Sequence, residues 1–222
     1  MNTNKNELIK SSLTRLKCNA NAQAIEILET WKMCLNQCIS KYREHFELYG
    51  IGIAMPGPFD YERGISLIKN VGKFDSLFGI NIRQYFSSEF KIDPLKVIFL
   101  NDAACFALGE YFYGALKSEH EIHKKCLFLT IGSGFGSTFL SDGKVVSDGD
   151  TVPDYGWLYH VAFKEARAED YFCDKWIIKR YELLMLGSER KQFAGVNDIP
   201  DDSLKGEFYK IIIFEDYAFE RE

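Results

Sequence analysis

Apolar side chains return every three or four residues between Ile25 and Phe46, which is the spacing that keeps one face of a helix hydrophobic. We therefore predict a long helix over this stretch, with Asn19 or Asn21 as its N-cap. Upstream of the helix, Glu7–Leu16 has room for a short strand.

Two short apolar runs in the first half of the chain lack helical spacing and predict buried strands, one over Leu48–Ala54 and one over Lys96–Leu100. The segment Asn81–Phe90 between them predicts a short helix, and Pro94 ends it before the second strand. Gly64–Ile68 is compatible with a further short strand.

The second half begins with a predicted helix over Asp102–Leu116, which is rich in alanine and other good helix formers. Cys126–Ile131 predicts another buried strand, and the turn Ser141–Lys144 after it predicts a hairpin. Aromatic residues along Ala166–Met185 predict a long helix. Two further helices are predicted nearer the C-terminus, over Ser188–Phe193 and Asp201–Glu222.

The junction after the second strand holds the strongest candidate for chemistry. An apolar run, Val97–Leu100, ends in Asn101-Asp102, so a buried strand delivers a carboxylate to the first turn of a helix. Such a strand fixes the position of a catalytic base while the loop end exposes it, and the helix N-terminus favours the ionised carboxylate. The alternative interpretation of Asn101-Asp102 is a simple helix cap.

Two loops that follow predicted strands are candidates for ligand binding. Met55-Pro56-Gly57-Pro58-Phe59-Asp60 is either a stiff turn or one wall of a cleft, because ligands tend to bind beyond the carboxyl ends of strands in α/β sheets. Gly132-Ser133-Gly134-Phe135-Gly136 is either a plain turn or a loop whose amides approach phosphate oxygens. A hairpin rather than a helix follows the glycines, which argues against a Rossmann dinucleotide site.

Composition narrows the class of protein. The net charge is -5 and the isoelectric point is near 5.5, which disfavours a nucleic-acid partner. No apolar run approaches the roughly 20 residues of a membrane span, and Met1–Lys10 lacks the apolar core of a signal peptide. We therefore expect a cytoplasmic protein without membrane contact. The 6 cysteines include no C-x-x-C pair and are expected to be reduced, buried thiols.

Three segments together resemble the ROK family of bacterial sugar kinases and sugar-responsive repressors. Gly50–Asp60 looks like the family's G-I-G-x-x-x-P-G-P strand and loop. Asn101-Asp102-Ala103 followed by Ala107–Glu110 looks like its N-D-A-N-x-A-x-x-G-E segment. Thr130–Gly136 looks like its T-x-G-T-G-x-G hairpin. The resemblance extends from about Leu13 to Phe219 and implies an α/β fold of the actin-like ATPase (ribonuclease-H-like) class, with partial subdomains over residues 1–103 and 104–222.

The resemblance also implies roles for individual residues. Asp102 matches the catalytic base, which takes the proton from the sugar hydroxyl that attacks the γ-phosphate of ATP. The residues that match sugar-binding positions are Asn101, Glu169, Asn70 and, at the histidine position of a later motif, His160. The residues that match the phosphate-binding hairpin are Gly132, Ser133, Gly134 and Gly136. A lone histidine such as His160 is, as a rule, a packed or surface residue, so that alternative stays open.

Several parts of the family pattern do not occur in this sequence. The phosphate-binding D-x-G-x-T would precede Met1, and Met1–Lys17 contains no glycine. The zinc motif C-x-C-G-x-x-G-C is absent, so no zinc is expected, and Trp157 occupies the glutamate position of the usual G-E-[IL]-G-H. The sequence also ends before the G-G segment that would hold adenosine. We therefore expect a fold that is incomplete at both ends.

These matches and absences leave three hypotheses. The first is an ATP-dependent kinase that phosphorylates a hexose or amino-hexose, with Mg²⁺ as the companion of ATP if the protein is active. The second is a non-catalytic sugar-binding or regulatory relative, and the third is a truncated pseudo-kinase. If these 222 residues are the whole protein, poor ATP binding and little kinase activity are expected. The resemblance further suggests a homodimer.

Overall fold

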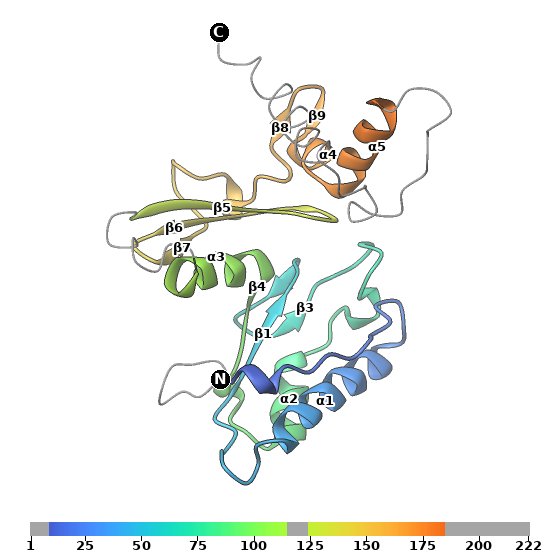
Figure 1. Cartoon of the computed structure of the whole chain (residues 1–222), viewed down its shortest axis with the longest axis vertical. Helices are drawn as coiled ribbons and strands as arrows, with labels where there is room; N and C mark the ends of the chain where they lie inside the picture. Colours follow the sequence, from blue (N-terminus) through green and yellow to red (C-terminus); the bar gives the residue numbers. More distant parts are fainter. Residues whose placement is uncertain (1–8, 115–123, 185–222) are drawn as a thin grey trace. The chain divides into compact units, whose positions relative to one another are not determined.

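The computed structural model describes residues 9–114 and 124–184, which fold as two units, Met1–Cys105 and Phe106–Glu222 (Figure 1). Helix α3 begins at the end of the first unit and continues into the second. Across the described residues, no helix combines the length and the apolar character needed to cross a membrane.

The first unit is built on two parallel strands, β1 (Ile51–Met55) and β4 (Val97–Asn101). In their register Ile51 lies opposite Val97 and Met55 lies opposite Asn101. The remaining elements of the unit are η1 (Lys10–Ser12), α1 (Ala24–Ser40), β2 (Phe59–Asp60), β3 (Ile65–Ser66), η2 (Asp75–Leu77), α2 (Ile82–Phe90) and η3 (Pro94–Lys96). Strands β2 and β3 form a small antiparallel pair of their own.

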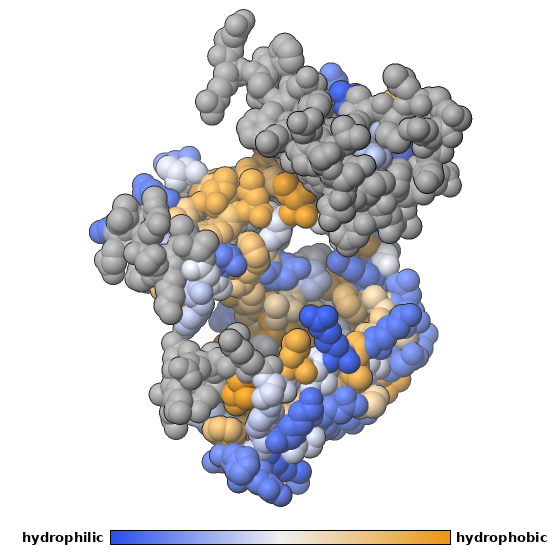
Figure 2. Space-filling model, viewed as in Figure 1, coloured by the Kyte–Doolittle hydropathy of each residue, from blue (hydrophilic) through white to orange (hydrophobic). Residues whose placement is uncertain are grey.

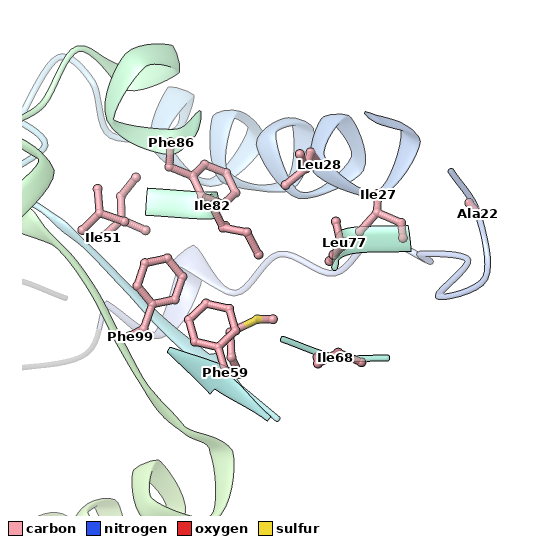
Figure 3. Packing of buried hydrophobic residues seen from close by; sticks show 12 residues of the cluster. Ala22, Ile27, Leu28, Ile51, Phe59, Ile68, Leu77, Ile82, Phe86 and Phe99 are labelled. Carbon is pink, nitrogen blue, oxygen red and sulfur yellow. The ribbon is translucent and has the colours of Figure 1, made fainter. Parts of the chain in front are cut away.

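One hydrophobic core lies between the two helices and the β1–β4 pair (Figure 3). Ile27 and Leu28 reach it from α1, and Ile82 and Phe86 reach it from α2. The helices are amphipathic because their apolar residues recur at helical spacing, and burying that face supplies most of their stability. Alternate residues of the strands, such as Ile51, point into this core. The residues between them point to the opposite face, where Ile98 is 61% exposed.

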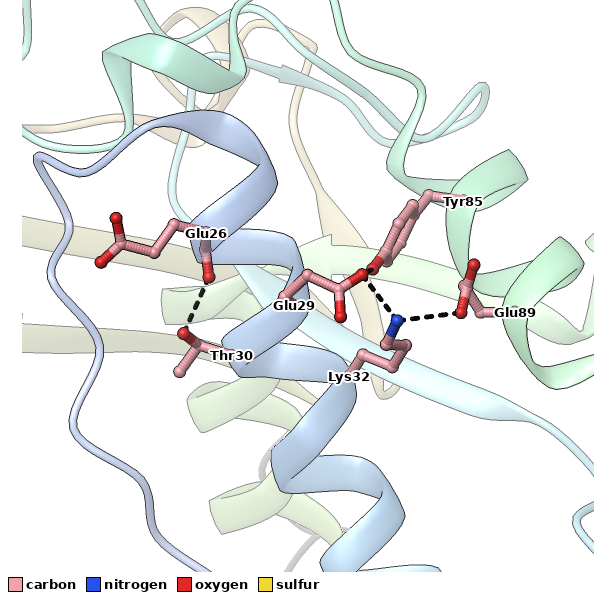
Figure 4. A network of polar contacts seen from close by, with 6 residues as sticks. All are labelled: Glu26, Glu29, Thr30, Lys32, Tyr85 and Glu89. Carbon is pink, nitrogen blue, oxygen red and sulfur yellow. Dashed lines mark hydrogen bonds and ion pairs between the residues drawn. The ribbon is translucent and has the colours of Figure 1, made fainter.

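A polar network joins α1 to α2 at the surface (Figure 4). The Glu29 carboxylate accepts hydrogen bonds from Lys32 Nζ at 2.6 Å and from the Tyr85 hydroxyl at 2.9 Å, and Lys32 also pairs with Glu89 at 3.1 Å. Partial burial and the hydrogen bond to Glu29 raise the pKa of Tyr85 to about 12. The hydrogen bond from Lys32 lowers the pKa of Glu29, and the same bond raises the pKa of Lys32.

In the first unit, the sequence predicts which helices and strands form more accurately than it predicts where they begin and end. Helix α2 and its N-cap Asn81, whose side chain accepts from Gln84 N at 2.9 Å, lie where they were expected. Strand β1 starts at Ile51 rather than Leu48, and α1 ends at Ser40, before the last apolar positions of its predicted stripe.

Two predictions near the N-terminus are wrong. Neither Asn19 nor Asn21 caps α1, because its N-cap is Gln23 and the Asn19 carboxamide instead accepts from Asn21 N at 3.0 Å in a separate turn. Within the described part of Glu7–Leu16 a 3₁₀ turn, η1, stands in place of a strand. That segment packs on α1, since the Cys38 thiol donates to Ser12 O and the Cys34 thiol to Thr14 O.

The second unit is built on a three-stranded antiparallel sheet in the order β5-β6-β7, with bounds Lys125–Ile131, Phe135–Ser141 and Lys144–Val146. This confirms the predicted strand and hairpin. Helix α3 (Asp102–Tyr113) packs on one face of the sheet, where Ala107 and Tyr111 meet Leu140. The other elements are η4 (Asp154–Gly156), β8 (Ala162–Phe163), β9 (Ala166–Arg167), α4 (Ala168–Tyr171) and α5 (Asp174–Leu184).

The predicted long helix over Ala166–Met185 is wrong. Its first residues form β9, and the chain then breaks between α4 and α5 at Phe172 and Cys173. The break has a physical cause, because the Phe172 ring stacks on Phe135 of the sheet at 4.9 Å and Cys173 is buried. The predicted helices over Ser188–Phe193 and Asp201–Glu222 lie outside the described residues.

The cysteine prediction is correct for bonding and partly wrong for burial. All 6 thiols are free, as expected for reduced cysteines. Only Cys173 is buried, whereas the other 5 are half-buried. Two of these, Cys34 and Cys38, share one face of α1, and their thiols serve as weak donors to the backbone of the preceding segment.

Candidate functional site

The loop after β1 and the helix after β4 start at the same edge of the sheet in the first unit. Because β1 and β4 are parallel and Met55 lies opposite Asn101, the loop that starts at Pro56 and the helix that starts at Asp102 begin side by side. In open α/β sheets this carboxyl-terminal edge is where ligands bind. The geometry of this edge is therefore set by strand register rather than by the loops themselves.

Asn101 is the N-cap of α3. Its side-chain oxygen accepts from the backbone amides of Ala103 at 3.0 Å and Ala104 at 3.2 Å, which satisfies two donors at the helix start. Its Nδ2 donates to the Tyr61 hydroxyl at 3.2 Å. The helix-cap interpretation of the sequence is therefore correct for Asn101, and one amide hydrogen of Nδ2 has no assigned partner among the described contacts.

Asp102 occupies the first turn of α3, and its side chain is exposed. Its carboxylate accepts from the amide of Ala103 at 3.0 Å. The 12-residue helix directs the positive end of its dipole toward this group, which favours the anion. The arrangement is a fixed, charged acceptor that faces solvent, beside the side chain of Asn101.

Tyr61 connects the end of β1 to the start of α3, and the sequence analysis does not identify it. Its hydroxyl donates to Met55 O at 3.0 Å while it accepts from Asn101. Burial of the ring raises the pKa of the Tyr61 phenol and the Asp102 carboxylate raises it further, while the bond from Asn101 lowers it. Burial and the charge of Asp102 also raise the pKa of the Cys105 thiol. An aromatic residue directly after the Pro-Gly-Pro loop is the signal that could have pointed to Tyr61.

Arg83 supports this edge from α2. Its guanidinium donates to Tyr61 O at 3.3 Å and Glu62 O at 2.9 Å, and it lies over the Phe99 ring at 5.7 Å. The turn at Gly64 allows this approach, because Gly64 has φ +74° and a Cβ there would lie 2.5 Å from Arg83 Cβ. The loop of Tyr61 is thus held by side chains on both sides.

The glycine loop of the second unit joins β5 to β6 at Gly132, Ser133 and Gly134. Gly132 N donates to Gly134 O at 3.0 Å, which closes the turn. Among the described residues, the amides of Ser133 and Gly134 have no hydrogen-bond partner. Gly136 belongs to β6, where it pairs with Thr130. The loop proper therefore comprises three of the four predicted phosphate-binding residues.

Two later segments approach this loop closely. Glu169, on α4, is half-buried, and a Cβ on Gly134 would lie 2.9 Å from its Oε1. Asp174 N, at the start of α5, donates to Gly132 O at 2.7 Å. The break between α4 and α5 is what brings both contacts to the loop. Glu169 places a negative charge against the loop, which suits a hydroxyl or a cation better than a bare anion.

His160 lies on the segment that holds Glu169 from the other side. Glu169 N donates to Tyr159 O at 3.0 Å, and the ring of His160 contacts that of Tyr159 at 5.0 Å. His160 Nδ1 is buried, and no atom of the described residues forms a hydrogen bond with it. The same segment is fixed to β6 by the buried Ser137, whose hydroxyl donates to Gly156 O and accepts from Leu158 N, both at 2.8 Å.

The predicted site residues thus fall into separate groups. Asn101 and Asp102 lie together in the first unit, and the glycine loop, Glu169 and the His160 segment lie together in the second. Asn70 is exposed in a loop of the first unit, with φ 59°, and no described hydrogen bond joins it to Asn101. In the described residues no group of three acidic, histidine or cysteine side chains has the arrangement of a metal site.

Comparison with known proteins places these features in a family. The profile of the ROK family matches residues 6–167. An N-acetyl-D-glucosamine kinase of Aliivibrio salmonicida is 35% identical over 111 residues, which are 49% of this chain and 33% of that protein. The chain therefore spans about a third of the length of this relative.

Solved structures show the same fold. A ROK family transcriptional regulator, a homolog of the E. coli MLC protein, matches 86% of this chain and 50% of its own with a TM-score of 0.64 at 15% identity. A ROK family glucokinase from Streptomyces griseus, solved with glucose and AMPPNP, matches 77% of this chain and 53% of its own with a TM-score of 0.56 at 17% identity. Both a kinase and a regulator therefore share the actin-like fold of this chain.

Proposed function

This chain belongs to the ROK family, and from that premise we propose that it binds a hexose or amino-hexose at the carboxyl-terminal edge of β1 and β4. In this proposal Asp102 is the base for phosphoryl transfer from ATP to a sugar hydroxyl. The observation that carries it is the exposed Asp102 carboxylate, fixed at the start of α3 beside Asn101. A positioned carboxylate of this kind typically contributes 10²–10⁴-fold to proton transfer.

The hydrogen-bond pattern of Asn101 supports the direction of that transfer. Its oxygen is occupied by Ala103 N and Ala104 N, so Asn101 can offer a ligand only an N–H. A sugar hydroxyl that accepts this N–H has its own proton available for Asp102. The proton then passes to the carboxylate, the sugar oxygen bonds to the terminal phosphorus, and the bond from that phosphorus to ADP breaks.

The glycine loop is the proposed contact for phosphate. The unpartnered amides of Ser133 and Gly134 fit a phosphate oxygen. The Glu169 carboxylate beside Gly134 repels an anion at this position. Two arrangements fit this charge: either the phosphate of ATP binds together with Mg²⁺, or Glu169 binds a sugar hydroxyl. His160 and Asn70 remain proposed sugar-binding residues, and the contact of the His160 segment with Glu169 supports the former.

An assay of ADP release tests the proposal. The full chain is supplied with MgATP and a panel of hexoses and N-acetylated hexosamines. Sugar-dependent turnover with at least one sugar, even at a low rate, supports the proposal, and Asp102→Asn should then lower kcat by roughly 10²–10⁴-fold. Sugar binding should survive the substitution, because the carboxamide keeps the shape of the side chain.

Asp142→Asn is the matched control. Asp142 is exposed in the β6–β7 turn with φ 49°, a conformation that asparagine tolerates. The turnover of the Asp142→Asn variant should equal that of the unsubstituted chain within about twofold, since surface substitutions usually have little effect. Undiminished turnover in Asp102→Asn would refute the role given to Asp102.

One observation favours a second candidate function. The Glu169 carboxylate against the glycine loop disfavours bound phosphate, and a transcriptional regulator shares this fold. In that case the chain binds sugar without transferring phosphate. Thermal unfolding separates the two, because stabilisation by a sugar with no ADP release supports the regulator. Stabilisation by MgATP together with ADP release supports the kinase.

A further inference from the structure

The hydroxyl of Tyr61 lies between the ends of the two parallel strands. It donates to Met55 O at the end of β1 at 3.0 Å, and it accepts from Asn101 Nδ2 at the end of β4 at 3.2 Å. The Pro-Gly-Pro loop passes beside the same oxygen, since a Cβ on Gly57 would lie 3.6 Å from it. One hydroxyl therefore contacts both strand ends and the loop that follows β1.

The hydrogen bonds through Tyr61 have a single possible direction. Met55 O can accept but not donate, so the phenol proton lies on that side and the phenol oxygen is left to accept from Asn101. On the other side of Asn101, the carboxamide oxygen accepts from Ala103 N and Ala104 N. The carboxamide is thus held at its oxygen and at its nitrogen, and no bond among the described residues occupies the second hydrogen of Nδ2.

The ring of Tyr61 is itself fixed by the core of the first unit. It is half-buried and contacts the buried Phe59 ring at 5.2 Å, and Phe59 packs on Phe99 of β4 at 5.0 Å. The Arg83 guanidinium donates to Tyr61 O at 3.3 Å. A hydroxyl on a ring with these contacts loses little further freedom when it bonds Asn101, which is what a positioning group requires.

The charge of the candidate base helps to keep this hydroxyl protonated. Burial of the ring raises the pKa of the Tyr61 phenol, the bond from Asn101 lowers it, and the Asp102 carboxylate raises it again. The net effect is a raised pKa, so Tyr61 retains the proton that Met55 O accepts. The hydroxyl therefore lies within electrostatic reach of both residues proposed to bind the reacting sugar hydroxyl.

We propose that Tyr61 is a positioning residue for the sugar site, whose hydroxyl fixes the Asn101 carboxamide so that its second N–H is held ready for a sugar hydroxyl beside Asp102. This inference rests on the proposed function. Asn101 then offers one donor and Asp102 one acceptor, which match the oxygen and the proton of a single hydroxyl. Tyr61 itself does not contact the sugar. It acts through Asn101, by orienting the group that orients the hydroxyl.

NMR of the side-chain amides of the full isotope-labelled chain, without ligand, tests the positioning. Loss of one amide signal pair in Asn101→Ser identifies the Asn101 carboxamide, because serine keeps a capping oxygen but lacks the nitrogen. In Tyr61→Phe these hydrogens should exchange with water about 2–10-fold faster, which is the factor expected for one lost hydrogen bond. An unchanged exchange rate would overturn the proposal.

Tyr85→Phe is the matched control for that measurement. It removes another tyrosine hydroxyl of the first unit, one that bonds Glu29 on α1 instead of a group at the strand ends. Figure 2 shows that the visible surface over α1 is largely hydrophilic, as expected for a network that faces solvent. Exchange of the Asn101 amide should be the same in Tyr85→Phe as in the unsubstituted chain. Equal acceleration in both variants would contradict a specific role for Tyr61.

Sugar affinity tests whether Tyr61 acts through Asn101. The midpoint of thermal unfolding of the full chain is titrated with the same hexoses and N-acetylated hexosamines. Tyr61→Phe should weaken binding of the tightest sugar about 2–10-fold in the unsubstituted chain, and less than about twofold in the Asn101→Ser background. Equal weakening in both backgrounds would overturn the proposal, because Tyr61 would then act by another route.

The two measurements separate the failure of this inference from the failure of the proposed function. Sugar binding that Tyr61→Phe leaves unchanged would overturn the inference and leave the proposed function standing. No stabilisation of the unsubstituted chain by any sugar of the panel would refute the proposed function. Faster amide exchange in Tyr61→Phe would then still show that Tyr61 positions Asn101, and unchanged exchange would refute that as well.

Discussion

The two units hold their loops by opposite means. At the edge of β1 and β4, side chains carry the contacts, since Tyr61 joins Met55 O to Asn101 and Arg83 holds the backbone of Tyr61 and Glu62. At the glycine loop of the second unit, the backbone of the loop itself is approached closely, by Asp174 N at Gly132 O and by the Glu169 carboxylate at Gly134. The first arrangement depends on the polar side chains of the loop, and the second depends on loop residues that lack a side chain.

This difference predicts how each region can be broken. The first unit should be sensitive to lost hydroxyl and guanidinium contacts and to crowding around Arg83. The second should tolerate a methyl group at low cost to folding but change what the loop can bind. Four substitutions or titrations, taken from the largest expected effect to the smallest, test that contrast.

Gly64→Ala should have the largest effect. Gly64 has φ +74°, and the new Cβ would lie 2.5 Å from Arg83 Cβ and 2.9 Å from Phe99 Cε2. Left-handed strain of about 1–2 kcal/mol and overpacking of about 1–3 kcal/mol should together lower the free energy of unfolding. Urea denaturation followed by tryptophan fluorescence measures the loss of stability. Gly79→Ala, with φ +78° and nothing within 4 Å, isolates the strain alone.

Tyr61→Phe should cost about 1–2 kcal/mol in the free energy of unfolding, because Met55 O and Asn101 Nδ2 each lose a partner. Under the proposed function the loss should also raise the KM for sugar, since Asn101 Nδ2 loses its contact with Tyr61 while the Asn101 oxygen keeps its two backbone donors. Tyr49→Phe is the control, because that side chain is 66% exposed. Equal stability in the two variants would show that the bridge through Tyr61 contributes little.

Gly134→Ala should change folding by less than about 1 kcal/mol, because the Cβ meets only the flexible end of Glu169, at 2.9 Å, and the backbone there is not left-handed. The displaced carboxylate should alter ligand affinity far more than stability. Gly132→Ala, with nothing within 4 Å, is the comparison. A large loss of stability in Gly134→Ala alone would contradict the low cost expected here.

The surface network of α1 and α2 should have the smallest effect. The pKa of Tyr85 is raised to about 12, so its neutral form is favoured by the fold. The stability it contributes is therefore complete below about pH 10, the ordinary tyrosine pKa, and is lost as pH rises through 12. Tyrosinate absorbance should show a group that titrates near pH 12 and disappears in Tyr85→Phe. An unchanged titration in that variant would rule out this assignment.

Sequence alone could locate the edge of β1 and β4 but not the contacts that hold it. Apolar runs followed by Pro56-Gly57-Pro58 and by Asn101-Asp102 predicted two strand ends, and the parallel register places them side by side. The role of Tyr61 depends on its distance from Asn101 in space, which separation along the chain does not reveal. Of the two interpretations of Asn101-Asp102, capping is confirmed for Asn101 and catalysis by Asp102 stays a prediction.

Helical periodicity failed where tertiary contacts outweighed local preference. Residues 166–185 have the spacing of one helix, yet Phe172 stacks on Phe135 and the chain breaks there. No local pattern encodes that contact, because Phe135 lies in a different element. Asn19 failed as a cap for a related reason, since its carboxamide found a nearer amide in its own turn.

Trp157 is a natural fluorescent reporter for the second unit. The buried hydroxyl of Ser137 joins β6, which begins at the glycine loop, to Gly156 and Leu158, and Trp157 lies between those two residues. The indole stacks on Tyr155 at 4.8 Å, so its emission depends on how that segment is held. A ligand that shifts the glycine loop should therefore change tryptophan fluorescence without any added dye. Trp157→Phe would separate that signal from those of Trp31 and Trp176.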